Sequence, residues 1–237
     1  MDSRYYERAP HAIEQDFIAR EFISRVYGWM GVGLALTAVI SLLTVQSPTL
    51  LRLFVYNPIL RWGLLLGELG LVIYLSARIS KMTVGAATGG FVAYAAMNGL
   101  TLSVIFLIYT AASITSVFFV TAGTFAAMSA IGYVTKKDLS GIGSFCLMGL
   151  IGVIIASIVN LFVRSSMLDW LLSVLGVLIF IGLTAYDTQK IKNLARNIDP
   201  LSDAATKTAI LGALTLYLDF INLFLYMLRF FGQRRDD

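Results

Sequence analysis

The sequence has very few of the residues on which most metal and nucleophile chemistry depends. Of its 237 residues, one is cysteine and one is histidine. Cys146 therefore has no intrachain partner for a disulfide, and no cysteine–histidine metal cluster is indicated. His11 lies in a polar N-terminal segment. A serine-type intramembrane protease is excluded, because it needs a histidine at membrane depth.

Charge is also scarce. Only 14% of the residues are charged and 58% are hydrophobic, whereas soluble domains have about 25% and 45–50%. The net charge of +4 is typical of the loops of a membrane protein and does not indicate nucleic-acid binding. The first 25 residues mix acidic and basic side chains without an apolar core, so we expect no cleavable signal peptide.

Long apolar runs are what the sequence does have. At about 1.5 Å per residue, seven of them can cross about 30 Å of hydrocarbon. The sequence predicts an all-α integral membrane protein with a seven-transmembrane-helix bundle in one domain (26–232), between a polar N-terminal segment (1–25) and a polar tail (233–237). The expected spans are 26–45, 60–77, 84–108, 114–134, 142–163, 170–188 and 210–231.

Lysine and arginine residues set the expected orientation. The tail and loops on the N-terminal side of the predicted spans carry about twice as many of them as the other side. The positive-inside rule then predicts a cytoplasmic N-terminus. Arg229, Arg234 and Arg235 at the C-terminus favour the opposite orientation.

Two aspartates lie in apolar runs, where an ionisable side chain costs roughly 2.5–3.5 kcal/mol. Asp187 ends the run 170–186, and Asp219 lies inside 210–231. Such a residue normally faces a bundle interior or a watery cavity and marks an ion or proton path. Consecutive helices usually pack together. We therefore expect the polar faces of the last two helices to meet and, with a helical extension or tilt, to bring both carboxyl groups into one pocket.

Two carboxyl groups a few ångströms apart at low dielectric cannot both ionise freely. Such a pair can share one proton, or bind a hard cation such as Ca²⁺ when deprotonated. Asp187 and Asp219 are thus a predicted pH sensor on a cation path and candidate Ca²⁺ ligands, and no other cofactor is indicated. The alternative is structural, with Asp187 reaching Lys190 or Lys192 and Asp219 making structural hydrogen bonds.

Three further polar residues are candidates to line the pore or to belong to the latch, meaning the polar contacts that hold the pore closed. Asn222 lies on the same stripe of the last helix as Asp219. Glu68 is a third acid at membrane depth and could line the same cavity. Arg78 lies about three turns beyond Glu68, so it cannot pair with it along one helix but can reach an acid on another helix. Asn98 and Asn160 are expected to form interhelical hydrogen bonds.

A family resemblance is carried by two segments near the C-terminus. Residues 182–189 (GLTAYDTQ) followed by 216–224 (LYLDFINLF) resemble the paired C-terminal motifs of the Bax inhibitor-1 family, also called the transmembrane Bax inhibitor motif (TMBIM) family. The resemblance extends over roughly 25–232 and includes 25–30 (RVYGWM) and 99–103 (GLTLS). The chain looks most like a bacterial inner-membrane branch of that family.

The resemblance implies a seven-helix fold whose last helix is central and wrapped by the other six. It also implies a pH-sensitive calcium leak channel in the inner (plasma) membrane, not an enzyme, with the lipid bilayer, Ca²⁺ and H⁺ as its partners. Asp187 and Asp219 match the family's pH-sensing pair. In some members of the family an arginine near the end of the second helix takes part in this latch together with the aspartate pair. Arg78 is the candidate here, about one residue out of register.

Two other functions remain as alternatives. An intramembrane aspartyl protease also uses two aspartates on adjacent helices, but its second aspartate should follow Gly-x-Gly. Here Tyr217 and Leu218 precede Asp219, and none of the four prolines begins a Pro-Ala-Leu motif. A regulatory subunit of a membrane protease or other membrane machinery is the second alternative. Its membrane-protein partner would contact the polar segment 1–24.

Overall fold

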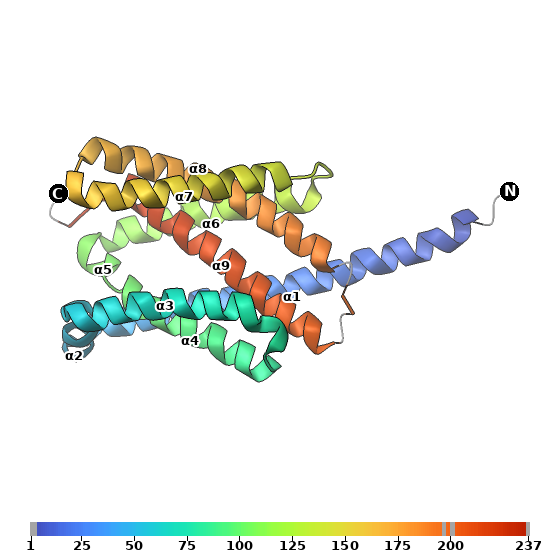
Figure 1. The fold of residues 1–237 in the computed structure, drawn as a ribbon, viewed down its shortest axis with the longest axis horizontal. Helices are drawn as coiled ribbons and strands as arrows, with labels where there is room; N and C mark the ends of the chain where they lie inside the picture. Colours follow the sequence, from blue (N-terminus) through green and yellow to red (C-terminus); the bar gives the residue numbers. More distant parts are fainter. Residues whose placement is uncertain (1–3, 196–197, 200–201, 236–237) are drawn as a thin grey trace.

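The computed structural model describes residues 4–195, 198–199 and 202–235, and it is helical almost throughout them (Figure 1). Short π and 3-10 turns, η1 (Leu51–Val55) and η2 (Ile79–Lys81), flank the third helix. The α-helices are α1 (Arg4–Gln46), α2 (Pro48–Leu50), α3 (Pro58–Arg78), α4 (Val84–Leu102), α5 (Ile105–Ile108), α6 (Ala111–Val134), α7 (Ser140–Val163), α8 (Ser166–Ala195) and α9 (Asp203–Phe231).

Within the described ranges, seven helical spans are long and apolar enough to cross a membrane, which confirms the predicted fold class. They are Ile18–Gln46, Pro58–Lys81, Val84–Ile108, Ala111–Val134, Ser140–Val163, Ser166–Ala195 and Asp203–Phe231. The chain is therefore a multi-pass membrane protein. A turn at Ser103 separates α4 from α5 inside the third span, where the hydroxyl of Ser103 donates to the carbonyl of Leu100 at 2.6 Å.

Polar capping residues begin the short helix α2 and four of the seven spans. Side-chain oxygens at these N-caps accept hydrogen bonds from backbone N–H groups in the first turn, which otherwise have no partner. The N-caps are Ser47, Asn57, Thr83, Thr110 and Ser202. Pro48 and Pro58 follow two of them, at a position where a helix loses nothing from a missing N–H.

Three helices extend beyond the predicted spans. α1 runs without a break from Arg4 through the boundary expected after residue 25. α8 continues past Thr188 to Ala195, and α9 begins at Asp203 rather than at Ile210. The extensions carry polar and charged residues, which hydropathy excludes from a span but which are good helix formers outside the hydrocarbon.

The last helix forms the centre of the bundle, as the family resemblance implies. Within its membrane-spanning window 67% of α9 is buried, whereas the other spans are between 11% and 39% buried. α9 contacts α1, α4, α6 and α8. In Figure 1 it crosses between a group formed by α6, α7 and α8 and a group formed by α1, α3 and α4.

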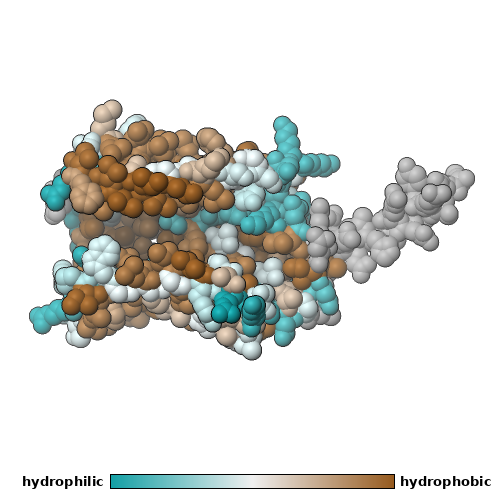
Figure 2. All heavy atoms as spheres, in the orientation of Figure 1, coloured by the Kyte–Doolittle hydropathy of each residue, from teal (hydrophilic) through white to brown (hydrophobic). Residues whose placement is uncertain are grey.

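The outer helices face lipid. On α7 the side chains of Phe145 and Phe162 are 72% and 83% exposed, and on α3 that of Ile59 is 82% exposed. Figure 2 shows such hydrophobic residues as brown bands along the length of the bundle. Large exposed apolar surfaces of this extent mark a membrane-contacting protein.

Both ends of α9 are fastened to other parts of the chain. At its start, Nζ of Lys207 donates to the carbonyl oxygens of Ser80 and Met82 at 3.0 and 3.2 Å. Beyond its end, the chain folds back on the connection before α6. There the N–H of Thr110 donates to the carbonyl of Gln233 at 3.1 Å. These contacts fix the position of α9 along the long axis of the bundle.

Candidate functional site

Asp187 on α8 and Asp219 on α9 meet where the central helix packs against α8. These residues are 9% and 5% exposed, and their two carboxyl groups lie close enough to interact electrostatically. A carboxylate has no hydrogen to donate, so two such groups can form a hydrogen bond with each other only when one of them carries a proton.

Few hydrogen-bond donors or positive charges lie near the two carboxyl groups to stabilise negative charge on them. No N–H or hydroxyl group of the described residues donates a hydrogen bond to the buried Oδ2 of Asp219. Lys190, one turn beyond Asp187 on α8, interacts with it electrostatically but is exposed, with Nζ 5.8 Å from the ring centroid of Tyr186. The site is therefore suited to a carboxyl pair that carries one proton.

Of the two lysines in the structural alternative, Lys190 interacts with Asp187 electrostatically, whereas Lys192 contacts another partner. Nζ of Lys192 donates to the carbonyl oxygen of Tyr133 at 2.6 Å. It also lies 4.8 Å from the centroid of the Tyr133 ring, within range of a cation–π contact. Lys192 therefore anchors the end of α6 to α8.

Close packing holds α8 in place at the level of the pair. A methyl group added at Gly132 on α6 would lie 2.2 Å from the carbonyl oxygen of Ala185, so only glycine permits this approach. The hydroxyl of Thr188 lies 3.4 Å from that of Ser129 on α6 and 3.5 Å from that of Tyr27 on α1. α8 is thus fixed against two neighbouring helices next to Asp187.

Asn222 lies one turn beyond Asp219 but is not joined to the pair by a hydrogen bond. Its Nδ2 donates to the carbonyl of Leu218 on its own helix at 2.8 Å. Its proposed part in the pore stays a prediction.

Glu68, on α3, belongs to a second polar cluster, which meets another face of α9. It is 7% exposed and accepts hydrogen bonds from Oγ1 of Thr101 at 2.5 Å and Nδ2 of Asn98 at 3.5 Å, both on α4. The interhelical role expected for Asn98 is therefore confirmed. Glu68 acts electrostatically on Tyr217, which lies two positions before Asp219 and so points to nearly the opposite side of the helix.

The polar cluster continues from Tyr217 to α1. The hydroxyl of Tyr217 lies 2.6 Å from Oγ1 of Thr37, which in turn donates to the carbonyl of Ala95 on α4 at 2.9 Å. The rings of Tyr94 and Tyr217 meet edge to face at 5.8 Å. No hydrogen bond to Oδ1 of Asn98 is present among the described residues. Glu68 and the aspartate pair are therefore two separate polar sites.

Arg78 is exposed at the end of α3 and forms no ion pair with a described carboxylate. A role for it in the latch stays a prediction.

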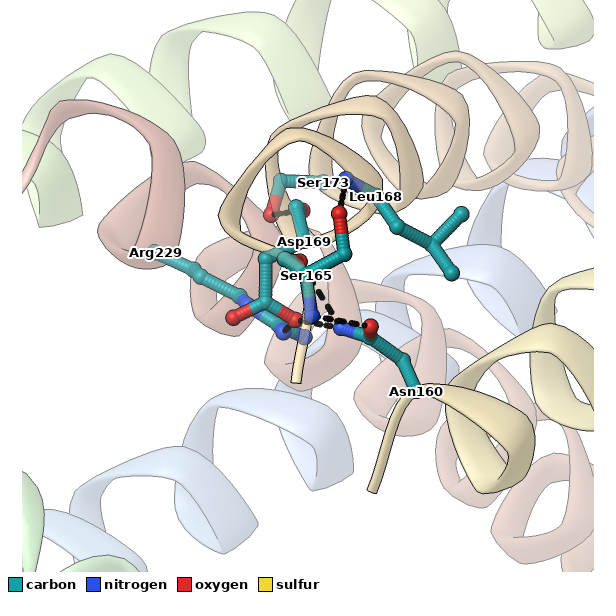
Figure 3. Close-up of polar contacts among 6 residues, drawn as sticks. All are labelled: Asn160, Ser165, Leu168, Asp169, Ser173 and Arg229. Atoms are coloured by element: carbon teal, nitrogen blue, oxygen red, sulfur yellow. Dashed lines mark hydrogen bonds and ion pairs between the residues drawn. The ribbon is translucent and has the colours of Figure 1, made fainter. Parts of the chain in front are cut away.

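A third polar cluster lies at the opposite end of the bundle (Figure 3), and sequence reasoning anticipated only the interhelical hydrogen bond of Asn160 within it. Asp169, in the first turn of α8, pairs with Arg229 in the last turn of α9. Nδ2 of Asn160 donates to Oδ1 of the same aspartate at 2.5 Å and to the carbonyl of Ser165 at 3.2 Å. The signal for this cluster was an acid and a base predicted at the same membrane face.

The described residues contain no group of three or more histidine, cysteine, aspartate or glutamate side chains that could hold a metal ion. Asp187 and Asp219 together offer four carboxylate oxygens, whereas Ca²⁺ takes about 6–8 oxygen ligands. The pair alone fits a passing cation, completed by water or backbone oxygens, better than a permanently bound one.

Fold and site together define a multi-pass α-helical membrane protein with a buried carboxyl pair between its central helix and α8. The family described as inhibitor of apoptosis-promoting Bax1 matches residues 19–236. The chain belongs to this Bax inhibitor-1 family. That description names no catalytic activity.

Bacterial relatives match over nearly their whole length. The chain is 52% identical to the inner membrane protein YbhL of Escherichia coli K12 over 215 residues, which cover 90% of this chain and 92% of the relative. It is 45% identical to a protein of Borreliella burgdorferi, covering 94% and 97% of the two chains. It is 39% identical to a membrane protein of Streptococcus pyogenes, covering 93% and 96%.

Proposed function

We propose that this protein is a pH-sensitive calcium leak channel in which Asp187 and Asp219 set whether cations pass. The observation that carries the proposal is that two buried carboxyl groups interact with each other at the contact between α8 and α9. With one proton between them, the groups carry a single negative charge and attract each other. Loss of that proton changes the sign of the interaction between the two helices.

The size of this change is sufficient for gating. Two unit charges about 4 Å apart interact by about 4 kcal/mol at the effective dielectric of about 20 that suits protein sites. Since about 1.4 kcal/mol corresponds to tenfold in an equilibrium constant, repulsion of this size shifts an equilibrium between two helix arrangements by roughly a thousandfold. A divalent cation at the same place relieves the repulsion, which is why the site would attract Ca²⁺.

We also propose an orientation and a cellular location for the protein. The end of the bundle at which α1 enters carries exposed basic residues on several elements, including Arg20, Lys81, Lys136 and Lys137. By the positive-inside rule this end, and with it the N-terminus, faces the cytoplasm. An inner-membrane location is supported by the E. coli relative, which is named an inner membrane protein.

Calcium flux in liposomes tests the proposal. Protein reconstituted into vesicles loaded with a calcium-sensitive dye is followed across about three pH units. Because the pair shares a single proton, flux should change by up to about tenfold per pH unit around its midpoint. Asp187→Asn and Asp219→Asn, which keep the shape of the side chain, should reduce that response to less than about twofold over the whole range.

A matched control is Asp138→Asn. Asp138 is exposed in the loop between α6 and α7 and accepts hydrogen bonds only from Ser140 among the described residues. The control should keep the pH response of the unaltered protein. Absence of Ca²⁺ flux, or a pH response that both asparagine variants retain, would refute the channel.

The alternative functions predict other outcomes in the same preparation. An intramembrane aspartyl protease would cleave a model membrane substrate and lose that activity in both asparagine variants. A regulatory subunit would show no flux of its own and would act only when its membrane-protein partner is reconstituted with it.

A further inference from the structure

A basic pocket lies at the end of the bundle where α6 ends and α8 leaves its apolar span. Its volume is about 580 Å³. Hydrophilic residues gather at this end of the molecule in Figure 2. Four basic side chains and, among the described lining residues, one carboxylate surround the pocket. They are Arg20 from α1, Lys136, Lys137 and Asp138 from the loop between α6 and α7, and Lys192 from α8.

Hydrogen bonds to α8 fix the loop that forms one wall of the pocket. Gln189 accepts a bond from the N–H of Leu139 at 2.9 Å and donates one to the carbonyl of Lys137 at 2.8 Å. Lys192 holds the end of α6 through the carbonyl of Tyr133 at 2.6 Å. A site whose walls are already in place loses little entropy when a ligand binds.

The positive charge of the pocket is not neutralised from within. The carboxylate of Asp138 accepts two bonds from Ser140, from its N–H at 2.9 Å and its hydroxyl at 2.7 Å. These bonds lower the pKa of Asp138, and its carboxylate interacts with Ser140 in the same turn. No described carboxylate forms an ion pair with Arg20, Lys136 or Lys137. The side chains that line the pocket therefore carry a net positive charge.

An apolar surface continues from the pocket toward the membrane. Val134 lines the pocket and is 72% exposed, and Ile131 lies one turn before it on α6, also exposed. On α7, Ile142 and Phe145 are exposed in the same way near the other end of the loop. A basic pocket bordered by lipid-facing side chains matches a ligand with an anionic head and apolar tails.

We propose that this pocket binds the phosphate headgroup of an anionic phospholipid from the adjacent leaflet, with an acyl chain lying along α6 and α7. The recognised chemistry is a phosphate diester that carries a negative charge, as in phosphatidylglycerol. Basic pockets on the cytoplasmic side of transmembrane helices bind such headgroups. The apolar border assigns the site to a lipid rather than to free phosphate, which has no apolar part.

Lipid retention on the intact protein tests this site. The protein is purified in detergent and mixed with phosphatidylglycerol or phosphatidylcholine, and bound lipid is measured by native mass spectrometry. Each basic residue near a membrane surface contributes roughly fivefold in affinity, so Lys136→Gln with Lys137→Gln should weaken phosphatidylglycerol binding roughly 25-fold. Both side chains are exposed, and neither forms a side-chain hydrogen bond or ion pair with another described residue, so this variant should fold.

The matched control removes the same charge from the opposite end of the bundle. Arg52→Gln with Arg61→Gln, both at exposed positions near the start of α3, should change phosphatidylglycerol binding by less than about twofold. Inorganic phosphate alone should not displace the bound lipid. An equal loss in both double variants, undiminished binding in the lysine variant, no preference over phosphatidylcholine, or displacement by inorganic phosphate would each overturn the lipid site.

Discussion

The contact between Gly132 and Ala185 gives a sharp test of how α6 and α8 are packed. A Cβ atom at Gly132 would lie 2.2 Å from the carbonyl oxygen and 2.9 Å from the carbonyl carbon of Ala185. Nonbonded heavy atoms prefer separations of about 3.5–4.0 Å. Because the obstacle is backbone, no side-chain rotation relieves it. In Gly132→Ala the two helices must therefore separate by about 1 Å.

A control on the same helix isolates the cost of that separation. Gly123 on α6 is exposed and has nothing within 4 Å of an added Cβ. Gly123→Ala gains the helix propensity of alanine, about 1 kcal/mol, without a clash. Overpacking costs about 1–3 kcal/mol, and the backbone obstacle places Gly132→Ala at the upper end of that range. The free energies of unfolding of the two variants should thus differ by about 3 kcal/mol or more.

Thermal unfolding in detergent measures the difference. For a chain of this size, 1 kcal/mol corresponds to about 2–4 °C in Tm, so Gly132→Ala should melt roughly 6–12 °C below Gly123→Ala. Equal melting temperatures would show that α6 and α8 are not in backbone contact at this point. The packing that holds α8 beside Asp187 would then be wrong.

Two further predictions concern polar contacts of the central helix. Tyr217→Phe removes the hydroxyl that meets Thr37 at 2.6 Å in a buried site. It should lower the free energy of unfolding by about 1 kcal/mol, while Tyr74→Phe at an exposed position of α3 should leave Tm unchanged. Arg229→Gln breaks a pair with Asp169 whose side chains are 36% and 44% exposed, so solvent screening limits its cost to about 0–1 kcal/mol. A drop in Tm of more than about 5 °C would contradict that limit.

The helices were predictable because each crosses an apolar medium in which every backbone group must be satisfied within the segment. Their ends were not, because α1, α8 and α9 continue as polar helix beyond the hydrocarbon. Hydropathy measures depth in the membrane and carries no information on where a helix stops once it reaches water. The break at Ser103 was missed for a related reason, since its neighbours are all apolar.

The contact between Asp187 and Asp219 was predictable from two general facts. Neither carboxyl group can face lipid cheaply, and helices adjacent in sequence usually pack together. The same reasoning could not assign Glu68 to its partners on α4. One acid on an otherwise apolar helix shows that it must face inward, but the rotation of α3 relative to α9 depends on the packing of all the helices between them.

The central position of α9 determines the order in which the protein can be completed. The helix that the others surround is the last to leave the ribosome, so six spans enter the bilayer before their common neighbour exists. Until then Asp187 and the polar residues that α9 later covers must be shielded by lipid headgroups, water or a membrane chaperone. Truncation before α9 therefore leaves polar residues that are buried in the complete bundle, Asp187 among them, without the helix that covers them.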